Sequence, residues 1–298
     1  MASSHPLSAS SLFCLKGWVA VVTGGGTGIG LMITQALASN GAKVYITGRR
    51  TDVLETTARV HGTAERLGSG GGAIVPLAMD VTSKESITNA VERISQQESH
   101  INVLVNNAGV WAGRPSAKPQ DGPEAYGKAM FDEGIEDGWQ RAFLTNSTAP
   151  YLVTAAFVPL LAKAQGSTTG KAGSVINISS SSGMITLSQN SQYSYNVSKA
   201  ALNHLTRQMA YELRNENINI RVNAIAPGYF PSEMTAGPSD DNNQNTYEQE
   251  GFRQFMQSMG AKVTRMGSAE ELASVVLTLA TNDYITGAII PVDGGFTL

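Results

Sequence analysis

The sequence predicts an α/β domain in which a doubly wound parallel sheet of seven strands carries helices on both faces. Short apolar runs alternate with helical stretches along the chain, 298 residues at 42% hydrophobic content suffice for one large core, and a glycine-rich turn follows the first apolar run. The alternation keeps one rhythm throughout, so we expect a single domain. The expected strands are residues 18–23, 43–47, 73–79, 101–107, 173–179, 218–226 and 288–294.

Between these strands, two stretches have clear helical spacing. Residues 31–41, LMITQALASNG, end at a glycine, and residues 196–213 form the longest amphipathic run. Residues 111–137 and 236–251 are rich in Pro, Gly and polar side chains, so we expect loops on one scaffold. Residues 1–15 are expected to be a flexible leader before a domain that spans residues 16–298.

Charge and composition exclude several classes of function. With a net charge of −3 and no dense Lys/Arg block, the chain has no positive electrostatic field that would attract the phosphate backbone of nucleic acid. No run approaches the roughly 18 apolar residues of a membrane-spanning helix, and the first residues lack a secretory-signal pattern. One cysteine, Cys14, and four scattered histidines predict neither a disulfide framework nor a metal site. We therefore expect a cytoplasmic protein without nucleic-acid or membrane partners.

The first chemical motif is VAVVTGGGTGIG, residues 19–30, in which an apolar strand runs into glycines before a helix. Bare backbone N–H groups at a helix N-terminus can approach a phosphate closely. The spacing Gly24-x3-Gly28-x-Gly30 differs from the G-x-G-x-x-G pattern. No Lys-Ser/Thr follows the glycines, which argues against a nucleoside-triphosphate loop.

Five short motifs lie in register along the chain: Thr23-Gly24-x3-Gly28-Ile29-Gly30, Asp80-Val81, Asn106-Asn107-Ala108-Gly109, Tyr195-x3-Lys199 and Pro227-Gly228. In this order the chain, from about Lys16 onward, resembles the short-chain dehydrogenases/reductases. It is similar to the branch of 3-oxoacyl-carrier-protein reductase-like and gluconate-5-dehydrogenase-like enzymes. The resemblance implies a single-domain Rossmann-like fold, a nicotinamide cofactor, and hydride transfer between a carbonyl and an alcohol.

The resemblance also implies which residues contact the cofactor. They follow the first, third, fourth and sixth strands or lie on the active-site helix: Gly24, Gly26, Thr27, Gly28, Ile29, Gly30, Asp80, Val81, Asn107, Ala108, Gly109, Tyr195, Lys199, Pro227, Gly228 and Thr235. The resemblance also places Asn106 against the cofactor and implies that the asparagine side chain of this motif ties neighbouring strands together.

The end of the second strand, VYITGRR, indicates which nicotinamide is used. A carboxylate that would hold an unphosphorylated ribose is missing there, and Arg49 and Arg50 follow Gly48. Arg49 is placed to pair with a 2′-phosphate and Arg50 to assist, although two arginines could also simply open a solvated helix. We expect NADP(H) as the cofactor.

Helical spacing selects one of two neighbouring tyrosines. A phenol with a pKa of about 10 is a poor acid or base near neutrality unless a fixed positive charge favours its phenolate. Tyr195 and Lys199 are four residues apart and share a helix face, whereas Tyr193 would face Val197. We predict that Tyr195 donates the proton and that Lys199 poises it and grips the cofactor ribose, with Tyr193 as a pocket-wall or packing residue.

The serine run of ISSSSG leaves two candidates on one strand face, Ser180 and Ser182. The family pattern Ile-Ser-Ser-x-x-Gly gives Ser180 the catalytic place, while the family's usual distance from Tyr195 favours Ser182. We expect Ser180 to bind the substrate oxygen, with the loop before Tyr195 lengthened. Asn146 matches the family's asparagine that helps to hold a water leading from the lysine toward solvent.

Two segments are expected near the substrate. The excess length over the family's common form falls in residues 111–137, which could enlarge the substrate mouth or merely cover a surface. A substrate lid is expected near residues 229–262. The apolar stripe Phe252, Phe255, Met256 and Met259 suits either lid or helix packing.

These features predict an NADPH-dependent reductase that acts on a ketone or aldehyde, reversibly on a secondary alcohol. The resemblance implies a homodimer or homotetramer. Two alternatives are an NADP(H)-binding scaffold with a non-redox step such as cyclisation or dehydration, and a module that senses NADPH without turnover. The complete set of Ser180, Tyr195, Lys199 and Asn146 favours the reductase.

Overall fold

A computed structural model describes residues 5–298 of the chain. Its single sheet has seven parallel strands in the order β3-β2-β1-β4-β5-β6-β7, as the sequence predicts. The observed strands begin and end within two residues of the expected ranges. They are β1 (Val19–Thr23), β2 (Lys43–Gly48), β3 (Ala73–Ala78), β4 (Val103–Asn106), β5 (Gly173–Ile178), β6 (Ile220–Pro227) and β7 (Ile289–Val292).

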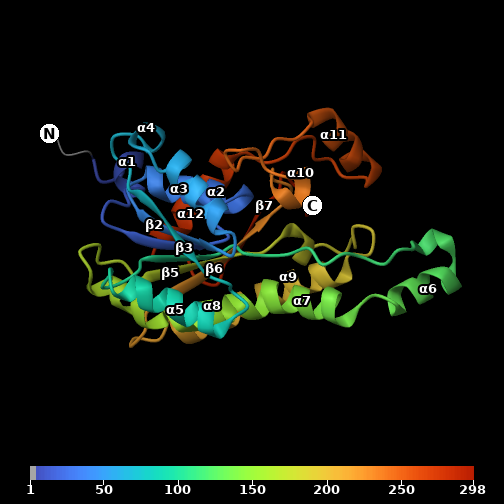
Figure 1. Cartoon of the computed structure of the whole chain (residues 1–298), viewed down its shortest axis with the longest axis horizontal. Helices are drawn as coiled ribbons and strands as arrows, with labels where there is room; N and C mark the ends of the chain where they lie inside the picture. The colour runs from blue at the N-terminus through green and yellow to red at the C-terminus, as the bar shows by residue number, and fades with distance from the viewer. Residues whose placement is uncertain (1–4) are drawn as a thin grey trace.

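Helices cover both faces of this sheet (Figure 1). One face packs against α2 (Gly28–Ser39), α3 (Thr51–His61) and α12 (Ala269–Thr281). The other packs against α5 (Lys84–Ser95), α8 (Ala149–Ala162) and α9 (Tyr193–Leu213). The shorter helices are α1 (Ala9–Leu12), α4 (Ala64–Leu67), α6 (Pro123–Phe131), α7 (Arg141–Phe143), α10 (Glu233–Ala236) and α11 (Gln249–Ser258). Within residues 5–298, no helix has the length and apolar character needed to cross a bilayer.

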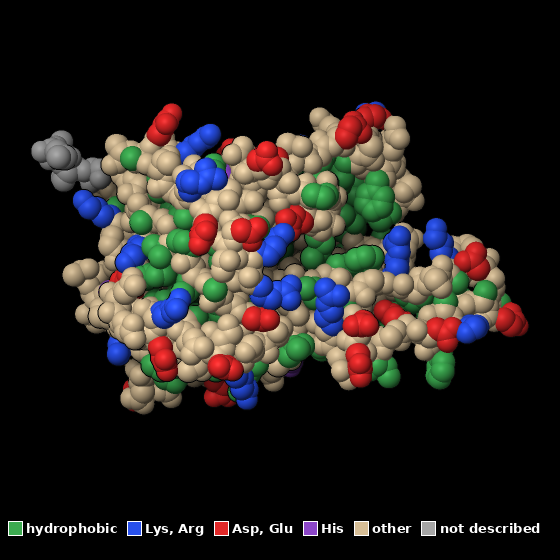
Figure 2. All heavy atoms as spheres, viewed as in Figure 1, with side chains coloured by type: hydrophobic (Ala, Val, Ile, Leu, Met, Phe, Trp, Pro, Cys, Tyr) green, Lys and Arg blue, Asp and Glu red, His purple; other side chains and the backbone are tan. Residues whose placement is uncertain are grey.

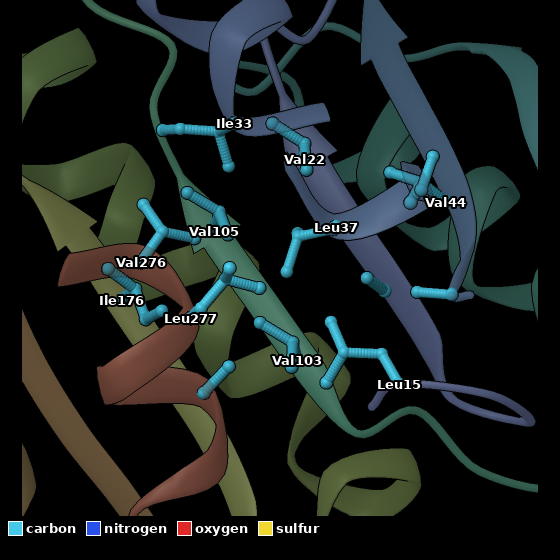
Figure 3. Packing of buried hydrophobic residues seen from close by; sticks show 14 of the residues in the cluster. Leu15, Val22, Ile33, Leu37, Val44, Val103, Val105, Ile176, Val276 and Leu277 are labelled. Atoms are coloured by element: carbon cyan, nitrogen blue, oxygen red, sulfur yellow. The ribbon is translucent and has the colours of Figure 1, made fainter. Parts of the chain in front are cut away.

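The two cores follow from the alternation of side chains along each strand. Val22 points to the face covered by α2 and α12, where it joins Leu37 and Val276 in one buried cluster (Figure 3). Its neighbour Val21 points to the opposite face and packs with Phe157 of α8. Because both faces are covered, every residue of β1, β4, β5 and β6 is buried.

The last residue of the segment expected to be a leader packs against the domain. Leu15 is fully buried in the core on the face covered by α2, α3 and α12, and its N–H donates to the Asn40 carbonyl over 2.8 Å. The short helix α1 precedes it. The boundary expected at residue 16 stays a prediction, and residues 1–4 of the expected leader lie outside the described residues.

The segment 111–137 contains helical structure that its composition does not predict. Pro123 starts α6, as proline commonly does at a first helical position, and residues 135–140 form a π-helical turn (η2). Figure 1 shows that the segment that carries α6 extends away from the sheet. We call residues 111–134 the arm. No residue of α6 is buried, so packing against a core does not explain this helix. Residues 237–248 are loop, as expected, but both ends of the expected range 236–251 are helical: Ala236 ends α10, and α11 begins at Gln249.

Arg221 ties β6 to the end of α12. Its side chain is fully buried, and its two terminal nitrogens donate to the carbonyls of Leu279 and Ala280 over 2.8 and 2.7 Å. Nε lies 3.2 Å from Asp283 Oδ1, an ion pair whose angle does not suit a hydrogen bond. A cation among the last carbonyls of a helix is favourable, since these carbonyls have no partner within the helix.

We expect Arg221→Met to lower the free energy of unfolding by about 3 kcal/mol, because it leaves the buried carbonyls of Leu279 and Ala280 without a donor and Asp283 with Lys171 as its remaining ion-pair partner. Urea denaturation followed by circular dichroism measures this loss. Arg93→Met, on the exposed surface of α5, is the matched control and should change stability by less than about 0.5 kcal/mol. Equal stability of the two variants would contradict this role of Arg221.

Candidate active site

A cavity of about 690 Å³ opens at the carboxyl ends of β1, β2, β4 and β5. Ligands bind at this edge in open parallel sheets, where the strand order reverses direction between β1 and β4. Fifteen of the predicted site residues line it: Gly24, Gly26, Thr27, Gly28, Ile29, Gly30, Arg49, Arg50, Asp80, Val81, Asn107, Ala108, Gly109, Tyr195 and Lys199.

The glycine-rich turn brings the N-terminus of α2 against this cavity. A Cβ on Gly30 would lie 2.0 Å from the Gly24 carbonyl oxygen, so only glycine allows this approach of helix and strand. Gly28 has φ +52°, and a Cβ there would meet Ser232 at 2.8 Å. Thr27 precedes α2 without a side-chain cap, so the N–H groups of the first turn face the cavity as an anion site.

The two asparagines at the end of β4, Asn106 within it and Asn107 after it, bond to different strands. Asn107 Nδ2 donates to the carbonyls of Thr23 and Gly24 over 2.9 and 3.1 Å, while Thr23 Oγ1 accepts from the backbone N–H of Asn107 over 2.9 Å. Asn106 Nδ2 donates to Asn177 Oδ1 of β5 over 2.8 Å. These bonds fix the floor of the cavity.

Arg49 and Arg50 have different surroundings. Both oxygens of Glu233 accept from Arg50, over 3.1 and 2.8 Å, and the hydrogen bond from Arg50 lowers the pKa of Glu233. Arg49 makes no ion pair with any described residue. It lies near Asp80: burial raises the pKa of Asp80, but hydrogen bonds from Thr82 and the charge of Arg49 outweigh burial and lower it. The guanidinium of Arg49 is thus the one available to an anion.

Tyr195 lines the cavity, and Ser180, which does not line it, interacts with the Tyr195 phenol. Burial raises the pKa of the Tyr195 phenol, a hydrogen bond with the Ser180 hydroxyl opposes this rise, and nearby Tyr229 adds to it. The backbone N–H of Ser182 donates to Ser180 Oγ over 3.1 Å. Geometry therefore pairs Ser180 with the phenol and gives Ser182 a supporting backbone contact.

Lys199 is buried beside Tyr195. Its Nζ donates to the Ile178 carbonyl over 2.8 Å and lies 5.9 Å from the centre of the Tyr195 ring. Burial lowers the pKa of Lys199 to about 8. An ammonium next to a phenol favours the phenolate, so this pair can give up and regain a proton.

Asn146 lies behind Lys199 in a second π-helical turn, η3 (Leu144–Thr148). Its Oδ1 accepts from the Val110 N–H over 2.8 Å, and its Nδ2 donates to the Val110 carbonyl over 2.9 Å and to Ser198 Oγ over 3.0 Å. A Cβ on Gly109 would lie 3.2 Å from Asn146 Oδ1 and 3.5 Å from Lys199 Nζ. Both amide protons of Asn146 are therefore used, and only its oxygen can accept another bond.

Three predicted cofactor residues do not line the cavity. Pro227 and Gly228 lie at the end of β6, where a Cβ on Gly228 would meet Asp293 at 2.8 Å. The Thr235 hydroxyl donates to the Phe230 carbonyl within its own turn. Three other residues of the segment after β6 line the cavity instead: Ser232, Glu233 and Met234.

The cavity also includes residues that sequence reasoning missed. They come from the helical stretch after the arm: Glu136, Asp137, Gln140, Arg141, Leu144 and Thr145. Two π-helical turns rotate this stretch, and no local sequence signal marks them. The described residues contain no group of three or more His, Cys, Asp or Glu side chains that could hold a metal ion.

The expected lid stripe divides into two parts. Phe252 and Met256 are buried in a small cluster with Met266, which is helix packing. Phe255 is 43% exposed and touches the Tyr229 ring edge-on. Figure 2 shows a hollow between the region of α10 and α11 and the arm that carries α6, with hydrophobic side chains on its walls.

Comparison with known proteins agrees with this geometry. The model of the short chain dehydrogenase family matches residues 18–243. Short-chain dehydrogenase/reductase PhomF of Diaporthe leptostromiformis is 36% identical, over 97% of this chain and 94% of that protein. The rhamnolipids biosynthesis 3-oxoacyl-[acyl-carrier-protein] reductase of Pseudomonas aeruginosa is 33% identical, over 96% and 98%.

A solved structure gives the same result. The Pseudomonas aeruginosa RhlG/NADP active-site complex superposes with a TM-score of 0.74 at 32% identity, covering 96% of this chain and 99% of that one. The fold, the cavity at the carboxyl edge and the family match over most of the chain lead to one conclusion: the chain belongs to the short-chain dehydrogenase/reductase family.

Proposed function

We propose that this protein is an NADPH-dependent reductase of a ketone or aldehyde, working reversibly on the secondary alcohol. The observation that carries the proposal is the contact of the Tyr195 phenol with Ser180 beside the buried Lys199, at the end of the cavity. Such a cluster can bind a carbonyl oxygen and deliver a proton to it.

Each residue of the site has its own role in this reaction. A hydride for the carbonyl carbon would come from a nicotinamide held in this cavity. The hydroxyls of Ser180 and Tyr195 bind the carbonyl oxygen, and the Tyr195 proton passes to that oxygen as negative charge develops on it. The Lys199 ammonium then stabilises the phenolate. Asn146 can take part in proton return only through its oxygen, which could accept from a water near Lys199.

The preference for a phosphorylated cofactor rests on Arg49. It lines the cavity, no described carboxylate pairs with it, and a guanidinium matches a phosphate dianion. Arg50 forms an ion pair with Glu233. Arg50 can therefore contact the phosphate only if this ion pair breaks. The NADP-bound relative supports the assignment.

We also propose a homo-oligomer, a dimer or tetramer, that forms through α8 and α9. An apolar groove runs between these helices, and Tyr211 and Tyr151 beside it are 83% and 51% exposed. A cytoplasmic location is proposed as well, consistent with the free, exposed thiol of Cys14.

A panel of ketones with NADPH, followed by the absorbance of NADPH, separates this function from its alternatives. Turnover with any carbonyl supports the reductase. Tight NADPH binding without oxidation by any carbonyl would instead support a non-redox scaffold or a sensor.

We expect Tyr195→Phe to lower kcat by about 10²- to 10⁴-fold, since it removes the proton donor. Cofactor binding, measured by quenching of protein fluorescence, should remain close to that of the native protein. Tyr193→Phe is the control. The Tyr193 hydroxyl bonds Tyr126 of the arm over 2.8 Å, so this variant should keep most of its activity. Similar activities of the two variants would refute the choice of Tyr195.

Arg49→Ala is expected to lower the preference for NADPH over NADH by at least about tenfold, because a charge-assisted contact with the 2′-phosphate is lost. The ratio of kcat/KM for the two cofactors measures this preference. Arg59→Ala, which changes an exposed arginine on α3 away from the cavity, should leave the ratio unchanged. An unchanged ratio in Arg49→Ala would remove Arg49 from phosphate recognition.

The pKa of Lys199 predicts the pH dependence of reduction. Below pH about 8 its ammonium is present, and above it the charge is lost, so kcat/KM for NADPH should fall as the pH rises through about 8. Lys199→Arg keeps a positive charge throughout this range and should lack the decline, whatever its absolute rate. A decline at the same pH in Lys199→Arg would assign it to another group.

A further inference from the structure

A chain of side-chain hydrogen bonds runs from the arm to the segment after β6. The indole Nε1 of Trp111 donates to Gln192 Oε1 over 3.1 Å. Gln192 Nε2 donates to Gln189 Oε1 over 2.7 Å, and Gln189 Nε2 donates to the Tyr229 hydroxyl oxygen over 3.1 Å. We name these four residues, Trp111, Gln192, Gln189 and Tyr229, the relay.

The direction of every bond in the relay is fixed by its first member. An indole N–H only donates, so it must face the oxygen of Gln192. The amide nitrogen of Gln192 then faces the oxygen of Gln189, and the amide nitrogen of Gln189 faces Tyr229. The Tyr229 oxygen is therefore the acceptor, which leaves its own proton unused. Among residues 5–298, no acceptor for that proton is found.

Tyr229 lies at the same edge of the sheet as Ser180. β5 and β6 are paired at Ile178 and Ile225, so Ser180 and Tyr229 both emerge at the carboxyl edge of adjacent strands. Tyr229 is also close enough to Tyr195 that its charge contributes to the raised pKa of that phenol. The ring of Tyr229 cannot swing away freely, because Phe252, Phe255 and Phe296 contact it edge-on at centroid distances of 5.6–5.9 Å.

The backbone of the turn that carries Gln189 is strained. Gln189, Asn190 and Ser191 all have left-handed φ angles, of 53°, 64° and 65°. Each such residue other than glycine costs free energy, and consecutive ones are concentrated at functional sites. Gln189 is buried. The arm supports this turn a second time, through the Tyr126 hydroxyl, which bonds Ser191 Oγ over 2.7 Å.

We propose that Tyr229 is a specificity-determining residue that donates a hydrogen bond to a second oxygen of the substrate, with Trp111 acting through the two glutamines as a positioning residue. The substrates are then ketones with a further hydrogen-bond-accepting oxygen near the reacting carbonyl. This inference rests on the reductase function proposed above. Phe255, whose ring contacts Tyr229 edge-on, is 43% exposed, so we expect an apolar part of the substrate beside it.

The test compares matched ketones. Ethyl acetoacetate is paired with 2-heptanone, and 1-phenyl-1,2-propanedione with phenylacetone, so that one member of each pair lacks the second oxygen. The native protein should favour the oxygenated member of at least one pair in kcat/KM. Tyr229→Phe should reduce this ratio by about three- to tenfold, the effect of one lost hydrogen bond. Trp111→Phe, which removes only the indole donor and lets both amides turn, should reduce it in the same direction.

Tyr247→Phe is the matched control. Tyr247 also packs edge-on against Phe252, but its oxygen accepts from the Met266 N–H outside the relay, so the ratio should stay at its native value. No preference in the native protein, or an unchanged ratio in Tyr229→Phe, overturns the inference. Either result would leave the reductase function intact, because that function fails only if NADPH is not oxidised with any ketone.

A binding measurement removes any dependence on turnover. In Tyr195→Phe with NADP⁺ present, calorimetry should show tighter binding of the oxygenated ketone in the preferred pair. Adding Tyr229→Phe should abolish this difference. Persistence of the full difference in the double variant would overturn the role of Tyr229.

Discussion

Lys199 is a cation in the interior of the domain, and its burial requires polar groups beside its ammonium. No described carboxylate pairs with it; its partners are a backbone carbonyl and the face of a phenol. Burying an ammonium is costly unless nearby dipoles compensate. The end of β5 provides one such carbonyl at Ile178, and α9 places Tyr195 one turn away. The proposed catalytic cluster thus depends on a sheet edge and a long helix that meet at one point.

Much of this arrangement is encoded locally and could be predicted. The strands have clear apolar runs, Gly30 is required by a close contact within one turn, and the Tyr195–Lys199 spacing places both residues on one helical face. Pairing β5 with β6 also brings Ser180 to the edge where ligands bind. These features depend on neighbours in sequence or on the simplest parallel topology.

What could not be predicted depends on contacts between distant segments. Arg50 and Glu233 are 183 residues apart, and nothing in either neighbourhood indicates that they pair. The π-helical turns that bring Arg141 to the cavity and Asn146 to Val110 depend on packing rather than on residue type. The apolar stripe of α11 was ambiguous for the same reason, because burial of Phe252 and exposure of Phe255 are decided by the segment after β6.

The arm that carries α6 has a consequence for how such an enzyme can diversify. None of the residues of α6 contributes to either core, yet Tyr126 reaches the turn just before the active-site helix. Surface residues of this kind usually change stability little when they are replaced. Mutational drift in the arm can therefore alter the surroundings of the reacting groups without threatening the fold. Within a family of common architecture, this segment is a place where new substrate ranges can evolve at low risk to folding.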